Sequence, residues 1–418
     1  MENLVSKMIN VESVQESYVL PLGKRPGKLI VPLCKTIPVV NLGGGDGRDQ
    51  TEIIQQILKA SQEFGFFQVI NHGVSVKTSS DMLSVAKEFF EMPVEDIATL
   101  YSDDSKQICR VCTSIDYDKE EVHYWRDSLR HLCHPVEEYM HLWPQKPTIY
   151  REVVATYSVE MRKLGSRLLD LIGEGLGLES GYFGDELSSE ELLMINNYPA
   201  CPDPSLTLGL PKHSDPNLIT LLLQEDVYGL QVFKDGQWIG IEPLPNAFVV
   251  NLGHQLQIIS NGMLRSADHR VVTNSSVART TVATFIHPSS ECIIEPAKPL
   301  VKAHGSPLYR AFQYKEFNSN YRAKIKDKRW RLELGLLLLL GTDGGGIGRM
   351  VELLDCSLLL LWSLAAPTRE GWYRDRSGAV MEVVAGYGDD GAAVSWRWRD
   401  IAVGKRNPLH SYCGGWFK

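Results

Sequence analysis

Three residues of this 418-residue chain have the chemical types of a metal site: His213, Asp215 and His269. Side chains two residues apart on a β-strand point to the same face, so a strand through His213 and Asp215 can present an imidazole and a carboxylate to one ion. His269 begins a later β-branched segment and can supply a second imidazole. Two histidines and one carboxylate on one face leave three octahedral positions open, as in non-haem iron(II) oxygenases. A histidine near an aspartate is by itself more often structural, so the prediction depends on further residues.

A carboxylate-binding pair follows His269 along the chain. Arg279 and Thr281 are again two residues apart in a β-branched segment. A guanidinium donates two parallel, charge-assisted hydrogen bonds to a carboxylate, and a threonine hydroxyl can add another. Upstream, Asn196 and Tyr198 have the same spacing and share a strand face. In isolation Arg279 would be interpreted as a surface ion pair, but beside a metal site we expect it to bind an acidic co-substrate.

Short strands are needed to position these residues, and the sequence predicts them from residue 192 onward. Segments rich in Val, Ile, Leu and Thr alternate with turn residues at 192–197, 218–223, 230–233, 237–241, 247–251, 269–272 and 280–286. Before them, periodic apolar residues predict helices over 49–64, 79–90 and 146–178, with strands at 37–42 and 66–70. Helices close the block at about 306–330. The expected fold is mixed α+β, with a jelly-roll core and flanking helices.

Composition bounds the class of protein. Hydrophobic residues make up 44% of the chain and charged residues 22%, an ordinary globular balance. The net charge of -8 argues against a nucleic-acid partner. No segment has the pattern of a signal peptide or a membrane span, and the eight cysteines are irregularly spaced. We therefore expect a cytoplasmic protein that acts on a small molecule, without a membrane partner, as a monomer.

The motifs together resemble those of a known family. Over residues 37 to about 320 the chain resembles the plant 2-oxoglutarate/Fe(II)-dependent dioxygenases of specialised metabolism, in particular the branch with flavanone 3-dioxygenase-like proteins and the salicylate hydroxylases related to downy mildew resistance. The matching motifs are Phe64–Gly73, Asn197–Pro202, His213–Asp215, Gly229–Gln231, Phe248–Gly253, Ser260–Gly262, His269–Val272 and Arg279–Thr281. The resemblance implies a distorted double-stranded β-helix, iron(II), 2-oxoglutarate, O2 and ascorbate.

The resemblance also implies roles for individual residues. His213, Asp215 and His269 match the iron ligands, while four residues match the 2-oxoglutarate contacts: Arg279, Thr281, Tyr198 and Asn196. Strand parity and resemblance make Phe285, Met194 and His287 candidates for the substrate pocket, and an aromatic lining favours a planar phenolic substrate. The chain departs from the family at Thr281, where serine is usual, and at His254, where aspartate is common.

The expected activity is hydroxylation of a flavonoid-like or salicylate-like metabolite, with release of succinate and carbon dioxide. Two alternatives remain: an oxidase of the same fold that does not use 2-oxoglutarate, of the ethylene-forming type, and a catalytically silent small-molecule binder. The predicted organisation is an N-terminal extension (1–36), a largely helical dioxygenase region (37–180), a jelly-roll catalytic region (181–330) and an atypical tail (331–418). We expect the tail to be poorly folded or a gene-model artefact, with a small extra domain as the alternative.

Overall fold

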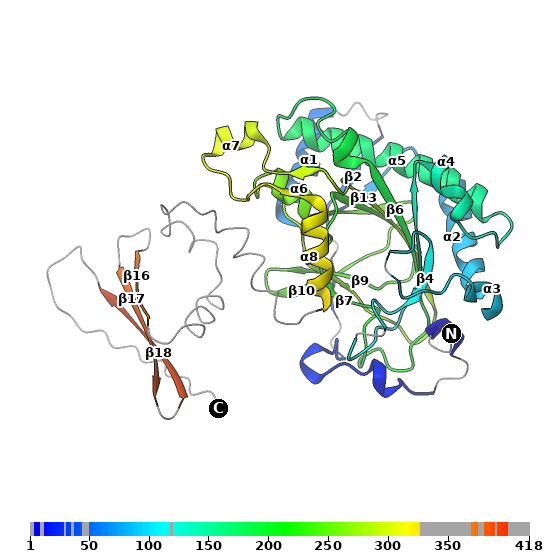
Figure 1. Cartoon of the computed structure of the whole chain (residues 1–418), viewed down its shortest axis with the longest axis horizontal. Helices are drawn as coiled ribbons and strands as arrows, with labels where there is room; N and C mark the ends of the chain where they lie inside the picture. Colours follow the sequence, from blue (N-terminus) through cyan, green and yellow to red (C-terminus); the bar gives the residue numbers. More distant parts are fainter. Residues whose placement is uncertain are drawn as a thin grey trace. The chain divides into compact units, whose positions relative to one another are not determined.

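Two β-sheets form the centre of the unit that spans residues 1–331 (Figure 1). The computed structural model describes residues 4–8, 12–28, 31–34, 37–43, 50–104, 106–117, 120–326, 369–374, 380–388 and 391–399. The larger sheet has the order β2-β3-β11-β8-β13-β6-β5-β4, with strands β2 (Val39–Asn41), β3 (Phe66–Ile70), β11 (Phe248–Leu252), β8 (Ile219–Gln224), β13 (Arg279–His287), β6 (Glu190–Tyr198), β5 (Asp127–His134) and β4 (Arg110–Thr113). The smaller sheet has the order β1-β10-β9-β12-β7, with β1 (Leu33–Cys34), β10 (Gln237–Ile241), β9 (Leu230–Lys234), β12 (His269–Val271) and β7 (Leu210–His213).

The two sheets pack face to face through one apolar core. Phe66, Tyr198 and Val249 come from the larger sheet, and Val232 and Val271 from the smaller one, and all of them belong to the same buried cluster. Burial of apolar area between two sheets is the main stabilisation of such a sandwich. This arrangement confirms the predicted jelly roll in a mixed α+β fold.

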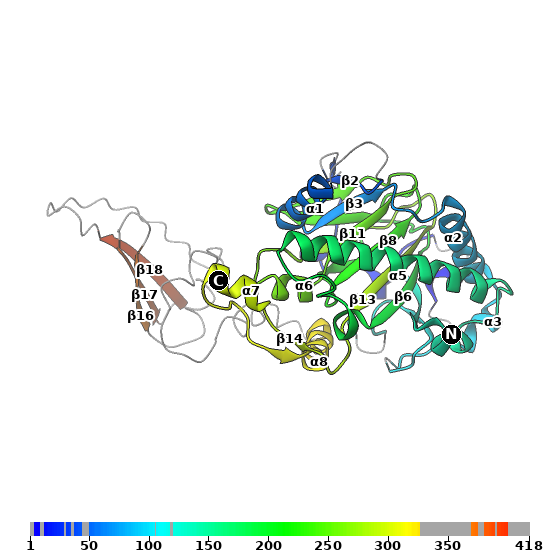
Figure 2. The ribbon, with the colours of Figure 1, turned by 90° about the horizontal axis from the view of Figure 1, so that it is seen from above.

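Helices cover the outer face of the larger sheet, as Figure 2 shows for the long helix α5. Gly165 in α5 lies so close to β13 that an added Cβ would stand 2.1 Å from Ile286 Cδ1, so glycine permits this close contact. The helices are α1 (Gln50–Glu63), α2 (Val76–Glu91), α3 (Val94–Ala98), α4 (Val136–Tyr139), α5 (Tyr150–Gly175), α6 (His254–Ile259), α7 (Lys298–His304) and α8 (Tyr314–Lys326), with short 3-10 helices η1 (Val5–Lys7), η2 (Glu16–Tyr18), η3 (Leu22–Lys24), η5 (Met140–Leu142) and η6 (Asp185–Ser188).

Within the two central sheets, β1, β4 and β5 were not predicted from the sequence. β4 and β5 lie inside the segment expected to be largely helical, and they extend the larger sheet beyond β6. The strand expected through His213 and Asp215 is present only in part, as β7, which is short and carries Pro211. These strands lack a long β-branched run, so their pairing partners, rather than local propensity, determine their conformation.

The N-terminal segment packs on the catalytic unit. Val5 and Tyr18 are buried in a cluster with Trp125 and Cys201. The backbone N–H groups of Val5 and Ser6 donate to the Asp127 carboxylate, at 3.0 and 2.6 Å. The segment therefore fixes the beginning of β5, next to the cavity described below.

The remaining described strands form two small sheets. β14 (Ile293–Ile294) pairs with β15 (Phe312–Gln313) in the first unit. In the second unit, residues 332–418, β16 (Arg369–Arg374), β17 (Val380–Gly388) and β18 (Gly391–Arg399) form an antiparallel sheet. Apart from these three strands, the tail that was predicted to be poorly folded lies outside the described residues. The predicted domain boundaries remain a prediction.

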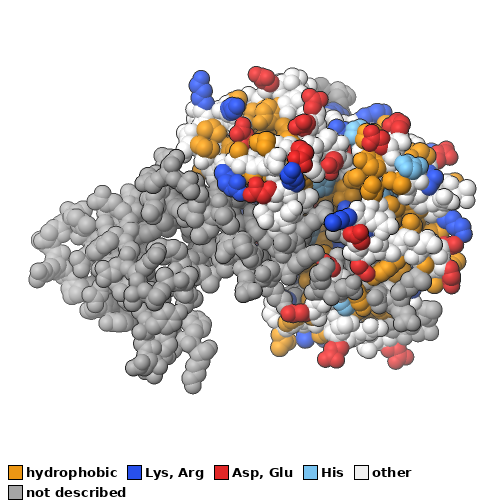
Figure 3. Space-filling view, viewed as in Figure 1, with side chains coloured by type: hydrophobic (Ala, Val, Ile, Leu, Met, Phe, Trp, Pro, Cys, Tyr) orange, Lys and Arg blue, Asp and Glu red, His pale blue; other side chains and the backbone are white. Residues whose placement is uncertain are grey.

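Two surface properties follow for the described residues. None of the described helices is long and apolar enough to cross a membrane. On the face seen in Figure 3, acidic and basic side chains of the first unit lie next to one another. The negative net charge is therefore not gathered into one patch on that face.

Candidate metal centre

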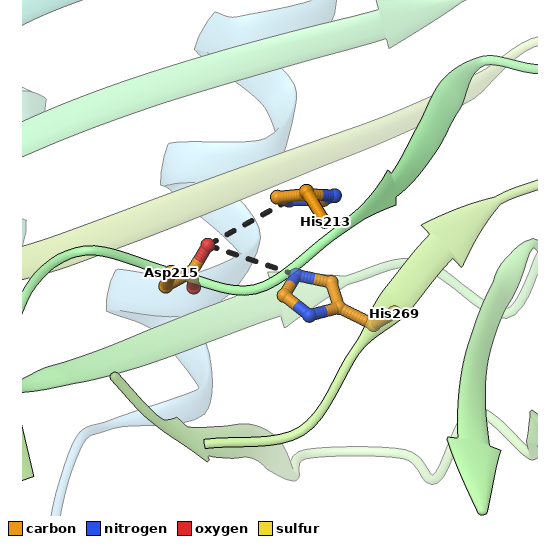
Figure 4. Close-up of side chains that lie close together, drawn as sticks. All are labelled: His213, Asp215 and His269. Atoms are coloured by element: carbon orange, nitrogen blue, oxygen red, sulfur yellow. Dashed lines mark ion pairs between the residues drawn. The ribbon is translucent and has the colours of Figure 1, made fainter. Parts of the chain in front are cut away.

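The three predicted ligands converge between β7 and β12. These strands are antiparallel neighbours in which His213 pairs directly with His269. Asp215 Oδ1 lies 3.6 Å from His213 Nε2 and 3.7 Å from His269 Nε2, and Figure 4 shows the carboxylate directed at both rings. Two atoms that each lie about 2.1 Å from one ion are at most about 4.2 Å apart. The donor set therefore fits a single metal ion.

Hydrogen bonds orient both imidazoles for metal binding. His213 Nδ1 donates to the Pro211 carbonyl at 2.9 Å, and His269 Nδ1 donates to the Ala267 carbonyl at 3.2 Å. Because a carbonyl only accepts, the proton must be on Nδ1, which leaves the Nε2 lone pair for a metal. Burial and the neighbouring His269 lower the pKa of His213 to about 4, and Arg126 acts in the same direction. His213 is therefore neutral at pH 7, as a ligand must be.

Asp215 is held through its other oxygen. Thr220 Oγ1 and Asn251 Nδ2 donate to Asp215 Oδ2, at 2.6 and 2.7 Å. Burial by itself would raise the pKa of Asp215, but His269, His213 and these two hydrogen bonds outweigh it, and the pKa lies below the usual value. The carboxylate stays ionised, with Oδ1 left for a metal.

The prediction that one strand carries both His213 and Asp215 is wrong. β7 ends at His213, and Asp215 lies in the turn that follows. The start of α6 fixes this turn, because His254 N–H donates to the Asp215 carbonyl at 2.8 Å and Gly253 N–H donates to the Leu218 carbonyl at 2.7 Å. A Cβ on Gly253 would stand 2.0 Å from the carbonyl oxygen of Asn217, so only glycine allows this contact. The tertiary contact with α6, rather than strand alternation, directs the carboxylate.

His254 does not join the ligand group. Its Nε2 lies 2.9 Å from Ser214 Oγ, and its ring packs against Phe317 and Tyr321 of α8. Among the described residues, His213, Asp215 and His269 form the one group of three or more potential metal donors. The imidazole at this position therefore has a packing role.

One cavity connects the ligands with most of the other predicted site residues. Arg279 pairs with Tyr198, Thr281 with Asn196, and Ala283 with Met194 across β13 and β6, so these side chains share the inner face. The cavity is lined by the three ligands together with Asn196, Tyr198, Arg279, Thr281, Met194 and Phe285. His287 is outside this lining, and its Nδ1 lies 2.6 Å from Tyr314 Oη.

Arg279 is almost completely buried in the cavity wall, with 1% exposure. Its Nε donates to the Val227 carbonyl at 3.0 Å and Nη2 donates to Gln224 Oε1 at 2.9 Å, while Tyr198 places its ring 5.5 Å from Cζ. Both hydrogen-bond acceptors are neutral, so the guanidinium charge remains uncompensated by them. A buried cation of this kind favours a carboxylate in the cavity.

Four cavity or supporting residues were missed from the sequence: Thr220 and Asn251, which hold Asp215; Gln224, which holds Arg279; and Arg126, which lines the cavity. Arg126 precedes β5, a strand that the sequence did not predict. A predicted strand at β5 would have indicated Arg126 as a site residue, because strand alternation places Arg126 and Ser128 on one face.

A jelly roll with two histidines, one carboxylate and a buried arginine in one cavity defines a non-haem iron oxygenase. Comparison with known proteins agrees. Residues 189–288 match the model of the 2OG-Fe(II) oxygenase superfamily, and residues 37–146 match that of the non-haem dioxygenase in morphine synthesis N-terminal region.

Several relatives are similar over most of their length. Protein DOWNY MILDEW RESISTANCE 6 of Arabidopsis thaliana is 42% identical over 335 residues, which cover 79% of this chain and 97% of the relative. Flavanone 3-dioxygenase 2 of Oryza sativa subsp. japonica is 41% identical over 325 residues, 77% of this chain and 94% of the relative. The crystal structure of JOX2 in complex with 2OG, Fe and JA is 34% identical, has a TM-score of 0.68, and is matched over 92% of its chain and 76% of this one.

The chain belongs to the 2-oxoglutarate/Fe(II)-dependent oxygenase superfamily. It is an oxidoreductase, a dioxygenase that uses iron(II) and 2-oxoglutarate, and ascorbate is typical of this family. The two alternatives, an oxidase independent of 2-oxoglutarate and a silent binding protein, are not favoured by these relatives.

Proposed function

We propose that this dioxygenase hydroxylates a small aromatic or phenolic metabolite, flavonoid-like or salicylate-like, at the metal centre. The supporting observation is that one cavity is lined both by the three ligands and by Phe285 and Met194. An aromatic side chain in the wall of a cavity favours a planar ring as ligand. The name of one relative, flavanone 3-dioxygenase 2, agrees with an aromatic plant metabolite.

We propose further that Arg279, Thr281, Tyr198 and Asn196 hold 2-oxoglutarate, with the distal carboxylate on Arg279. The guanidinium is buried against neutral acceptors, and Thr281 lines the same cavity. When bound, iron(II) and 2-oxoglutarate supply the activation of dioxygen, with release of succinate and carbon dioxide. The chain contributes three neutral or anionic donors in fixed orientation, a cationic anchor for the co-substrate, and buried walls that exclude water.

The substrate is tested by product analysis. Purified full chain is incubated with iron(II), 2-oxoglutarate, ascorbate and a panel of flavanones, salicylate and other phenolics. One product should gain a single oxygen by mass spectrometry, in step with succinate formation. Succinate formation that no aromatic compound stimulates would contradict the proposed substrate class.

The cellular setting is also a proposal: a cytoplasmic monomer without nucleic-acid or membrane partners. Five cysteines are free and buried, which fits a reducing compartment: Cys109, Cys112, Cys133, Cys201 and Cys292. Light scattering of the purified chain and localisation of a fluorescent fusion would test the two parts of this proposal separately.

A further inference from the structure

A second buried arginine lies in the cavity wall, and its one contact with the residues proposed to hold 2-oxoglutarate is a hydrogen bond to Asn196. Arg126 is 6% exposed and lines the same cavity as the metal ligands and Arg279. It lies immediately before β5, in which Asp127 pairs with Asn197 of β6, whereas Arg279 of β13 pairs with Tyr198 on the other side of β6. The two arginines thus come from opposite sides of β6, and Arg126 is not one of the residues proposed to hold the carboxylate on Arg279.

The hydrogen bonds of Arg126 fix its position without neutralising its charge. Nη1 donates to Asn196 Oδ1 at 3.2 Å, and Nη2 donates to the Ser114 carbonyl at 2.7 Å. Its Nε is buried and has no hydrogen-bond partner among the described residues. A guanidinium has five N–H groups in a planar fork, and an unpartnered buried donor is costly. Arg126 therefore retains donors for a further acceptor.

The nearby carboxylates are engaged elsewhere. Asp127 points away from the cavity and accepts from the N–H groups of Val5 and Ser6. Glu120 accepts from the Ser114 hydroxyl and from the N–H groups of Ile115 and Asp116. Within the described part of the chain, no ion pair joins either of them to Arg126. A molecule bound in the cavity can therefore supply the acceptor that completes the hydrogen bonding of Arg126.

The net charge of the cavity with iron(II) and 2-oxoglutarate bound also favours an anionic substrate. Arg126, Arg279 and Asp215 are its charged side chains, and iron(II) adds two positive charges, which makes three in net. The 2-oxoglutarate dianion cancels two of them. One positive charge remains, in a wall where burial makes an isolated charge unfavourable.

We propose that Arg126 is a specificity-determining residue that binds a carboxylate of the aromatic substrate, which makes the preferred substrate an aromatic acid rather than a neutral flavanone. The proposal rests on the proposed function. Asn196 Oδ1 and the Ser114 carbonyl hold the guanidinium in place, and the substrate carboxylate accepts from its remaining N–H groups. Loss of one charge-assisted contact of this kind should weaken binding about ten- to a hundredfold.

The test compares acids with their amides, because the two differ only in the charged group. Dissociation constants of 2-hydroxybenzoate and 2-hydroxybenzamide, of 4-coumarate and its amide, and of the neutral flavanone naringenin are measured by calorimetry. The full chain is loaded with Mn(II) and 2-oxoglutarate, so that no turnover occurs. The wild-type protein should bind at least one acid tenfold more tightly than its amide. In Arg126→Gln this preference should disappear, and Arg126→Lys should restore part of it.

A matched control is Arg110→Gln. Arg110 is an equally buried arginine on neighbouring β4; it donates to the Ser102 carbonyl and is not in the cavity wall. This variant should keep the acid preference, which separates loss of a buried guanidinium in general from loss of this one. Thermal unfolding of all variants checks that they fold.

Three outcomes would overturn the proposal: no acid bound more tightly than its amide, an acid preference that survives in Arg126→Gln, or a larger loss of 2-oxoglutarate affinity than of acid affinity in that variant. The last result would assign Arg126 to the co-substrate. Failure of the proposed function is visible separately, as wild-type protein with iron(II) that forms no succinate with any aromatic compound.

Discussion

The metal centre and the outer face of the larger sheet both bury histidines and carboxylic acids. Only at the metal centre do these side chains keep an atom that can bind a metal. On the outer face, His131 Nδ1 donates to the Leu132 carbonyl at 3.2 Å and Nε2 accepts from Tyr150 Oη at 2.8 Å. Burial lowers the pKa of His131 to about 4. Burial and the neighbouring His269 together lower the pKa of His213 to about 4 as well. Both histidines are neutral, but only His213 keeps its Nε2 lone pair for a metal. A lowered pKa therefore does not identify a ligand, whereas an unused lone pair does.

The buried carboxylic acids of the two regions, Asp215 and Glu191, differ even more strongly than the two histidines. Asp215 lies beside two imidazoles and accepts two hydrogen bonds, and its pKa is lowered. Glu191 is completely buried under α5, neither of its oxygens has a hydrogen-bond partner among the described residues, and burial raises its pKa to about 8 in spite of Arg162. Partners, not depth, decide whether a buried carboxyl is ionised and able to bind a metal.

The largest effect is expected for His213→Ala. Removal of one of three ligands should lower iron affinity by more than about a hundredfold and abolish turnover, since even outer-shell changes cost about 10–100-fold. Iron content by mass spectrometry and succinate formation measure the two effects. Full 2-oxoglutarate decarboxylation in this variant would remove the basis of the metal assignment. His131→Phe is the control and should retain iron.

Arg279→Ala should come next. Loss of a buried charge-assisted contact to a carboxylate costs about 2–3 kcal/mol, so the Michaelis constant for 2-oxoglutarate should rise about 30–150-fold. Initial rates at varied 2-oxoglutarate concentration measure it. An unchanged constant would count against Arg279 as the anchor, and Arg279→Lys should lie between the two.

Thr220→Val tests the support of Asp215. The variant removes one of the two donors to Oδ2, and iron affinity should fall about tenfold or somewhat more while the fold is kept. Competition with a chelator measures the affinity. Thr207→Val is the matched control, because Thr207 is a buried threonine outside the cavity wall. Equal iron affinity in both variants would show that Asn251 alone holds Asp215.

His131→Phe should alter stability and its pH dependence. Tyr150 Oη loses its partner, which should cost about 1–3 kcal/mol at pH 7. The unfolded chain protonates His131 near pH 6.5 and the folded chain only near pH 4, so acid favours unfolding over that interval. Urea unfolding at pH 7 and pH 5 should show a smaller loss on acidification in the variant than in the wild type. An equal loss in both would contradict the structural role of His131.

The smallest effect is expected for Glu191→Gln. The folded chain holds the Glu191 proton up to about pH 8 and the unfolded chain releases it near pH 4.5, so stability is lost as the pH rises between these values. A permanently neutral side chain avoids this loss and should raise the unfolding free energy at pH 8 by at least about 1 kcal/mol. Urea unfolding at pH 5 and pH 8 tests the prediction, and a destabilised variant at pH 8 would show that ionised Glu191 is stabilised by Arg162.

Much of the site was predictable because its motifs are local. Arg279 and Thr281, and Asn196 and Tyr198, lie on strands whose alternation places each pair on one face, and β13 and β6 have the predicted positions to within a few residues. Arg126 was not predictable in this way, since β5 has no clear strand signal and becomes a strand through pairing with β6 and β4.

The sequence by itself determined the residue types that bind iron, the family and the jelly-roll class, because these depend on composition and spacing along the chain. The tertiary structure decided which of the candidate side chains come together at the metal centre and its cavity. Asp215 reaches the metal centre from a turn that α6 holds, and His254 is held by Ser214 and the rings of α8. Arg126 faces the cavity while Asp127 binds the N-terminal segment. The direction of a side chain depends on hydrogen bonds to residues far away in the chain, which no local pattern contains.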